Sequence, residues 1–288
     1  MAAFDKSIKD APDVDELFTK AGLTITFGEG VENHAGMEII GKTASEGFKQ
    51  SELEAIHSEL EGRGVETRLI DLGAYLPSEL GTYKASVLVI PNGVSLFCDA
   101  KKLWDEIAGI PHDKKAFMYG RVVNKIARHN LCFYDFSQTP DFENKKGTVV
   151  DFKDTPLLSR VREGLPDILG EKSRKLGAET NLYYDVKTCG INAHNDRERK
   201  IVVGVRLGQN FAMAFRWIHQ NQYVGPRIDV ELHHGDIYIM DEKACGNDGA
   251  KRSIPTLRHA AGCEKYIKSL DDKKPKKARA SKVTTKKI

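Results

Sequence analysis

The spacing of hydrophobic positions changes along the chain, from partly helical in the first part to strand-like in the last. Over 51–64, Leu53, Ile56 and Leu60 recur at helical spacing behind Ser51, a candidate N-cap, and glycines close the segment. A similar apolar face runs through 155–169, and 99–110 has the character of a third helix. The pattern therefore predicts helices over these three ranges.

Strand-like segments lie between the helices and dominate after about Thr180. The stretches 66–72 and 84–93 indicate strands, the second closing in a Pro-Asn-Gly turn, and 116–136 mixes strand-like pieces with basic residues. After Thr180 we expect no helix, only short β-rich pieces separated by turn residues, over 180–186, 200–208, 210–218, 227–240 and 264–270. Several short strands at close spacing are typical of a sandwich or barrel.

This change in pattern predicts how the chain is organised. We expect an α+β protein with an α/β N-terminal extension over 1–115, a β-rich C-terminal core over 116–270 and a disordered tail over 271–288. Within the tail, 272–288 holds eight Lys/Arg and one Asp, a charge of +7. Because the whole chain carries +3, residues 1–271 carry −4. The tail is either a nuclear-localisation or nucleic-acid-contacting arm or a solubilising segment.

Composition narrows the setting of the protein. No run of about 18 apolar residues appears, and the N-terminus has no apolar signal core, so neither a membrane span nor secretion is expected. The five cysteines are odd in number and widely spaced, without a Cys-x-x-Cys pair, which argues against a disulfide framework and a structural zinc site. These features predict an intracellular protein, cytoplasmic or nuclear.

Candidate chemistry lies in the β-rich part, where His194 and Asp196 are one residue apart. They would project to the same side of an extended strand. A third ligand would have to come from a distant strand folded back beside them, and His259, which follows the turn-rich stretch 244–256, fits that role. Two imidazoles and one carboxylate can occupy one face of an octahedral metal, as in non-haem Fe(II) oxygenases. For His194 and Asp196 alone, the alternative interpretation is a surface turn.

The order of motifs over 175–270 resembles the Fe(II)/2-oxoglutarate-dependent dioxygenases, and within them the AlkB-like branch. The chain supplies Asn-Leu-Tyr at 181–183, His-Asn-Asp at 194–196, Leu-Gly at 207–208, His-Gly-Asp before an apolar strand at 234–240, and the distal His259. The resemblance implies a double-stranded β-helix, or jelly-roll, as the C-terminal core.

The resemblance also implies roles for single residues. His194, Asp196 and His259 would be the iron ligands and therefore the catalytic centre. Asn181 and Tyr183 would donate hydrogen bonds to the co-substrate, 2-oxoglutarate.

The anchor for the distal carboxylate of 2-oxoglutarate has three candidates. The family uses a basic residue on the last strand, commonly Arg followed by Tyr. Here Lys265 precedes Tyr266, and Lys268 lies two positions beyond it. Lysine binds a carboxylate as a point charge and lacks the bidentate fork of arginine. The third candidate, Arg206, lies on another predicted strand.

The resemblance thus implies an Fe(II)- and 2-oxoglutarate-dependent dioxygenase that uses O₂ to hydroxylate or oxidatively demethylate its substrate at a C–H bond. An AlkB-like enzyme would act on a nucleic-acid base, and a basic tail agrees with such a partner. Two alternatives stay open: a hydroxylase of a protein side chain or small molecule, and a non-catalytic β-barrel binding module. The basic residues Arg121, Lys125, Arg128 and His129 form either a phosphate contact or a solvated face.

Overall fold

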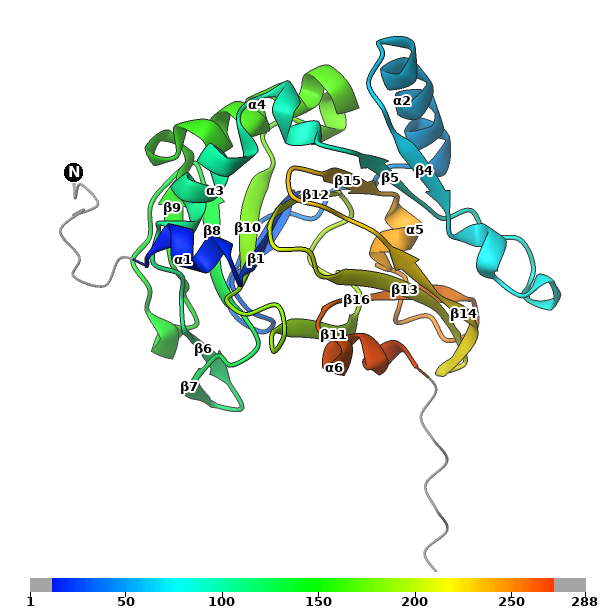
Figure 1. Ribbon diagram of the computed structural model, residues 1–288. Helices are drawn as coiled ribbons and strands as arrows, with labels where there is room; N and C mark the ends of the chain where they lie inside the picture. The colour runs from blue at the N-terminus through cyan, green and yellow to red at the C-terminus, as the bar shows by residue number, and fades with distance from the viewer. Residues whose placement is uncertain (1–11, 272–288) are drawn as a thin grey trace, which may run out of the picture.

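The computed structural model describes residues 12–271, which form three layers: helices, a large sheet and a small sheet (Figure 1). The large sheet has eight strands, in the spatial order β4 (Arg68–Asp71), β5 (Ser86–Ile90), β15 (Ile237–Met240), β12 (Val202–Gly208), β1 (Gly22–Gly28), β10 (Gly177–Tyr183), β8 (His129–Tyr134) and β9 (Val149–Asp151). Its neighbouring strands are antiparallel except for β8 and β9, which are parallel.

The small sheet has four strands, in the order β11 (Gly190–His194), β16 (Thr256–Gly262), β13 (Ala212–His219) and β14 (Gln222–Val230). It stacks on the large sheet through a shared apolar cluster, which includes Val89 and Met240 of the large sheet and Phe215 and Trp217 of the small one. The protein is therefore a mixed α/β fold in which two largely antiparallel sheets pack face to face, as in a β-sandwich.

After β10 the chain repeatedly crosses between the two sheets. β10, β12 and β15 belong to the large sheet, whereas β11, β13, β14 and β16 belong to the small one. The place between β10 and β12 is taken by β1, which comes from the start of the chain and pairs antiparallel with both. Since β1, β4 and β5 all precede residue 115, the expected boundary at 115/116 runs through a shared sheet.

The alternation of side chains along β1 explains its central place. Leu23, Ile25 and Phe27 point to one face and join the core beneath the helices. Thr24 and Thr26 point to the other face and line a cavity between the sheets. Every residue of the strand is buried. A strand with one apolar and one hydroxyl-bearing face thus separates the helical core from a polar interior.

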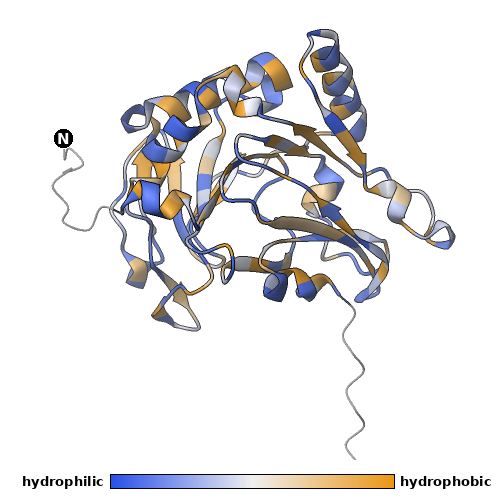
Figure 2. Ribbon diagram, viewed as in Figure 1, coloured by the Kyte–Doolittle hydropathy of each residue, from blue (hydrophilic) through white to orange (hydrophobic). Residues whose placement is uncertain are grey.

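Three helices cover the outer face of the large sheet: α2 (Gln50–Gly62), α3 (Ala100–Ala108) and α4 (Pro156–Leu169) (Figure 1). All three predicted helices are confirmed, and hydrophilic and hydrophobic segments alternate along α2 in Figure 2. The predicted cap of α2 is wrong. The helix begins after Lys49, whose N–H donates to Glu52 Oε2 at 2.8 Å, so Ser51 already lies inside it.

Two short helices lie after Thr180, where none was expected. These are α5 (Glu242–Cys245) and α6 (Glu264–Ile267), and α6 with the following 3-10 turn replaces the strand predicted over 264–270. In α6 the ring of Tyr266 packs on Gly190 so closely that a Cβ there would lie 2.4 Å from it. Tyr266, Ile267 and Leu270 are too few apolar positions to distinguish a strand from a helix, so the local sequence does not decide between them.

The remaining elements are small. They are α1 (Val14–Phe18), the hairpin of β2 (Gly30–Glu32) with β3 (Ile39–Gly41), and the hairpin of β6 (Lys115–Met118) with β7 (Arg121–Asn124). Among residues 12–271, no helix has the length and apolarity that crossing a membrane requires. The predicted disordered basic segment 272–288 lies outside the described residues.

Leu23→Ala is expected to lower the free energy of unfolding by about 2–5 kcal/mol, because Leu23 is fully buried in β1 and its loss leaves a cavity. Urea unfolding followed by circular dichroism measures this change. Ile126→Ala, at a side chain 76% exposed, is the control and should change stability by less than about 0.5 kcal/mol. Because β1 joins both halves of the sheet, the whole transition should shift. A second transition with an unchanged midpoint would contradict a single cooperative unit.

Candidate functional site

A cavity of about 860 Å³ lies between the two sheets, and the loop of the β2–β3 hairpin contributes to its lining. Much of the lining is polar. Six of the eight candidate residues line it: His194, Asp196, His259, Asn181, Tyr183 and Arg206.

The three candidate ligands meet in the wall of this cavity. His194, at the end of β11, lies directly opposite His259 on the neighbouring strand β16, with the ring centroids 4.2 Å apart. Asp196 follows β11, and its Oδ1 lies 3.8 Å from His194 Nε2 and 3.7 Å from His259 Nε2. One possible ligand atom from each residue lies within 4.8 Å of the other two. Among residues 12–271 this is the only such group of His, Cys, Asp or Glu side chains.

The charge states of the group suit metal ligation. Burial, with repulsion by His259 second, lowers the pKa of His194 to about 3, so its imidazole is neutral. His194 Nδ1 lies 2.8 Å from the Asn192 carbonyl oxygen, to which a proton on Nδ1 would donate. Burial alone would raise the pKa of Asp196, but His259, Arg199 and His194 hold it below its usual range. His259 Nδ1 is buried without a hydrogen-bond partner in the described chain.

A turn after α5 fixes the loop that carries Asp196. The Asp196 N–H donates to the Cys245 carbonyl at 3.0 Å, and Asn247 Nδ2 donates to the Asp196 carbonyl at 2.7 Å. Gly246, with φ at +79°, approaches Asn195 so closely that a Cβ would lie 2.9 Å from it. The backbone of the second ligand is therefore held from the sequence region 245–247, which the motif itself does not include.

The candidate co-substrate donors Asn181 and Tyr183 lie on β10. Asn181 Oδ1 accepts hydrogen bonds from Arg128 Nε at 2.5 Å and Asn130 Nδ2 at 2.9 Å. This arrangement fixes the amide and leaves its NH₂ group available to the cavity. Tyr183 is 2% exposed, and its ring centroid lies 4.5 Å from that of Phe211. Both side chains are therefore held in place by their neighbours.

Arg206 on β12 is a buried cation that forms no ion pair with a carboxylate of the described residues. It is 1% exposed, its Nη1 donates to the Phe211 carbonyl at 2.9 Å, and its Nε has no partner within residues 12–271. The guanidinium carbon lies 3.5 Å from the centroid of the Phe211 ring. Burial lowers the pKa of Arg206. An unpaired buried charge that borders a cavity is costly unless a ligand supplies the counter-charge.

Lys265 and Lys268, the other two candidate anchors, lie apart from the cavity. Both are exposed, Lys265 Nζ is 5.4 Å from the ring centroid of Tyr266, and Lys268 Nζ is 3.7 Å from Glu264 Oε1. Neither lysine lines the cavity. The chain leaves the small sheet at Gly262, where φ is +118°, and turns into α6, so the strand expected to carry these residues does not form.

The cavity also contains residues that the sequence did not single out. Thr24 of β1 lies between Asn181 and Arg206 and faces both in register. Glu32 of β2 and Glu179 of β10 also line the cavity. The alternation along 23–27 could have indicated a strand with a polar face, but it does not specify which strands pair with it.

The basic residues for which a phosphate contact and a solvated face were both considered have different environments in the structure. Arg121 is exposed, but Lys125 Nζ donates to Asn130 Oδ1 at 3.0 Å, and Arg128 orients Asn181. Burial lowers the pKa of Lys125 to about 7, so it is a weak cation near neutral pH. Lys125 and Arg128 therefore support the cavity wall.

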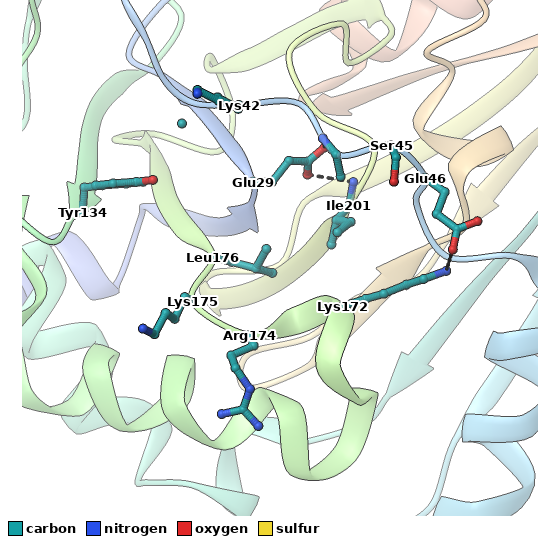
Figure 3. A pocket seen from close by; sticks show the side chains of 12 residues that line it. Glu29, Lys42, Ser45, Glu46, Tyr134, Lys172, Arg174, Lys175, Leu176 and Ile201 are labelled. Carbon is teal, nitrogen blue, oxygen red and sulfur yellow. Dashed lines mark hydrogen bonds and ion pairs between the residues drawn. The ribbon is translucent and has the colours of Figure 1, made fainter.

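A second hollow, of about 720 Å³, has none of the three candidate ligands in its lining (Figure 3). Two of its cations are paired, Lys172 Nζ with Glu46 at 3.2 Å and Arg174 Nη2 with Glu171 at 2.5 Å. Glu29 accepts two backbone N–H groups just before β12, at 2.6 and 3.0 Å. Most of its charged groups thus have structural partners.

Comparison with known proteins identifies a viral relative. No protein-family model matches the chain. The chain is 45% identical over 251 residues to "Uncharacterized protein R156" of Acanthamoeba polyphaga mimivirus, and the alignment covers 86% of this chain and 98% of the viral protein. Identity at this level over almost the whole viral chain means that the chain belongs to the family of this mimivirus protein.

Proposed function

We propose that the protein is an Fe(II)- and 2-oxoglutarate-dependent dioxygenase of the AlkB-like type. One observation carries the proposal: His194, Asp196 and His259 converge in the wall of a polar cavity that also contains the unpaired guanidinium of Arg206. Two imidazoles and a carboxylate leave positions open on an octahedral ion for a chelating co-substrate and O₂. Arg206 offers a charge opposite to that of a carboxylate ligand.

The spacing of Asp196 from the two imidazoles fits a divalent metal ion. Two atoms that each bind one ion at about 2.0–2.2 Å lie no more than about 4.4 Å apart. The Asp196 Oδ1 distances to the two imidazoles, 3.7 and 3.8 Å, are below this limit. His194 Nδ1 has a carbonyl oxygen partner, as is usual for the outer nitrogen of a metal-bound histidine. The outer nitrogen of His259 departs from that pattern, because it has no acceptor in the described chain.

2-Oxoglutarate fits the donors around Arg206. Its distal carboxylate would pair with the guanidinium, which offers a planar fork, whereas the exposed lysines of the α6 region do not line the cavity. Asn181 Nδ2 and the Tyr183 hydroxyl would donate to other co-substrate oxygens. Thr24, between Asn181 and Arg206 in register, adds a further hydroxyl on the same face.

The path of the chain supports a jelly-roll core. Strands β10 to β16 cross between two stacked sheets, as in a double-stranded β-helix. With β1 between β10 and β12, the four central strands of the large sheet have the order β15-β12-β1-β10, and the strands of the small sheet have the order β14-β13-β16-β11. In this interpretation β1 replaces the last strand of the family, which explains why α6 can follow the distal histidine.

The side chains of the protein would bind the metal ion and the co-substrate, orient them, and protect the reacting atoms. When bound, Fe(II) with 2-oxoglutarate and O₂ supplies the oxidation: one oxygen atom enters the C–H bond, and the other is released in succinate, with loss of CO₂. His194 and Asp196 provide a neutral imidazole and a carboxylate at neutral pH. The two sheets would shield the reacting atoms from water.

The substrate class stays a prediction. The AlkB-like resemblance implies oxidative demethylation of a nucleic-acid base. Lys125 and Arg128, however, support the cavity wall. The basic tail lies outside the described residues. Hydroxylation of a protein side chain or small molecule would use the same centre. Convergence of the three ligands beside Arg206 disfavours a binding module with incidental histidines.

The test is the anaerobic addition of Fe(II) and 2-oxoglutarate to the purified protein. We expect a visible metal-to-ligand charge-transfer band and, after O₂ is admitted, release of succinate. Absence of the band in folded protein would overturn the proposal. A screen of methylated oligonucleotides and peptides for increased succinate release would then identify the substrate class, and steep salt dependence would mark a nucleic acid.

A further inference from the structure

Two carboxylates line the cavity without belonging to the candidate metal group. Glu179 lies two residues before Asn181 on β10, so both side chains point to the same face of the strand, about 6.6–6.8 Å apart along it. Glu32, from the β2–β3 hairpin, donates its backbone N–H to Glu179 Oε2 at 2.9 Å. The two carboxylates therefore lie close to each other. They are displaced along β10, by two residues, from Asn181 and the donors near Arg206.

Local cations neutralise these carboxylates only in part. Arg199 Nη2 lies 2.7 Å from Glu179 Oε2 and 2.6 Å from Glu198 Oε1, so one guanidinium serves two carboxylates, with Glu32 as a third nearby. Burial, with repulsion by Glu198 and Glu179, raises the pKa of Glu32 to about 7. Burial also raises the pKa of Glu179. Glu179 and Glu198 thus share the one guanidinium of Arg199, whose Nη1 has no partner within residues 12–271.

Acceptor atoms remain available here. Glu32 Oε1 accepts the Gly36 N–H at 2.7 Å, and the other oxygen of Glu32 has no hydrogen-bond donor within residues 12–271. Glu179 uses Oε2 for Arg199 and the Glu32 N–H, and its Oε1 has no donor in the same range. Neither free oxygen is a fully buried, unpartnered atom, so both are open to a ligand in the cavity.

We propose that Glu32 and Glu179 bind a positively charged substrate group with several N–H donors, such as an amidinium or guanidinium. The inference rests on the proposed function, because 2-oxoglutarate then occupies the donors around Arg206 and leaves the carboxylates to the substrate. A planar group with parallel N–H bonds matches a carboxylate in both charge and geometry. A hard metal ion fits less well, since it requires six or more oxygen ligands and Arg199 already occupies Glu179 Oε2.

Three probes of nearly the same shape test this inference: benzamidinium, benzamide and benzoate. Each is titrated by calorimetry into the full-length protein loaded anaerobically with Fe(II) and 2-oxoglutarate, so that the donors around Arg206 are filled. We expect benzamidinium to bind most tightly, benzamide more weakly and benzoate not measurably. Glu32→Gln should weaken benzamidinium binding about ten- to hundredfold, because it removes a charge-assisted hydrogen bond and keeps the acceptor for Gly36.

Glu38→Gln is the matched control, since Glu38 belongs to the same hairpin but does not line the cavity. It should leave benzamidinium binding unchanged. Benzoate binding as tight as benzamidinium binding, or an unchanged affinity in Glu32→Gln, would overturn the inference. The charge-transfer band of the same samples reports on the proposed function separately. A band without benzamidinium binding rejects only the carboxylate site, whereas binding without a band supports the site and rejects the dioxygenase.

The pH dependence supplies a second readout. Deprotonated Glu32 attracts a cation, and its pKa is raised to about 7, so benzamidinium affinity should increase as the pH rises from roughly 6 to 8. The charged groups that face Glu32 are Glu179, Glu198 and Arg199. In Glu32→Gln this increase should be smaller, because only Glu179 then titrates at the site. An equal increase in the parent protein and the variant would contradict the role of Glu32.

Discussion

His259→Ala is expected to abolish Fe(II) binding and with it the charge-transfer band and succinate release. Its Nε2 lies 3.7 Å from Asp196 Oδ1, and its ring centroid lies 4.2 Å from that of His194, so the alanine variant retains two of three ligands. Loss of an outer-shell partner alone lowers metal affinity by about 10–100-fold, so loss of a ligand should lower it by more than about 100-fold. Asp196→Ala and His194→Ala should behave in the same way.

The measurement is Fe(II) affinity under anaerobic conditions, with far-UV circular dichroism to confirm the fold. His233→Ala is the matched control: its side chain is 50% exposed, it lies outside the cavity lining, and its Nδ1 contacts Asn210 at 2.9 Å. It should bind iron as the parent protein does. If His259→Ala kept the parent affinity while folded, the three residues would not form a metal site.

Arg206→Gln is expected to weaken 2-oxoglutarate binding while Fe(II) affinity stays unchanged. Arg206 is 1% exposed with no carboxylate partner in the described chain, so a bound carboxylate would complete a buried charge pair. Removal of one partner of such a pair costs about 2–5 kcal/mol, which is at least about 30-fold in affinity. Without 2-oxoglutarate the variant should be as stable as the parent or more stable, because an unpaired buried charge is gone.

Titration of the charge-transfer band with 2-oxoglutarate measures this effect. Lys265→Gln and Lys268→Gln are the controls, since both lysines are exposed and outside the cavity lining. They should leave 2-oxoglutarate affinity within about twofold of the parent value. The opposite result, with a lysine variant impaired and Arg206→Gln unaffected, would place the anchor on the α6 region and contradict the assignment to β12.

Much of the local structure could be predicted. Leu53, Ile56 and Leu60 lie on the buried face of α2, as their spacing indicated. His194 and Asp196, one residue apart, lie near His259, which was expected to fold back beside them from a distant strand. These predictions depend on short-range periodicity and on the limited ways in which antiparallel strands can return.

Other features could not be predicted, because they depend on partners distant in sequence. Thr24 faces Asn181 and Arg206 only because β1 pairs with both β10 and β12, more than 150 residues away. The segment that begins at Glu264 is apolar at positions that suit a strand or a helix, and the packing of Tyr266 on Gly190 favours the helix.

The sequence by itself determined the helical faces and most of the strands, since these depend on local spacing, and residue chemistry with the order of motifs indicated the three residues of the candidate metal group. Only the tertiary structure decided which strand completes the large sheet, and therefore that Arg206, not Lys265 or Lys268, borders the cavity with Asn181. Only the tertiary structure brought Glu32 to Glu179. The physical reason is that side-chain alternation specifies which face of a strand is polar but not which strand pairs beside it.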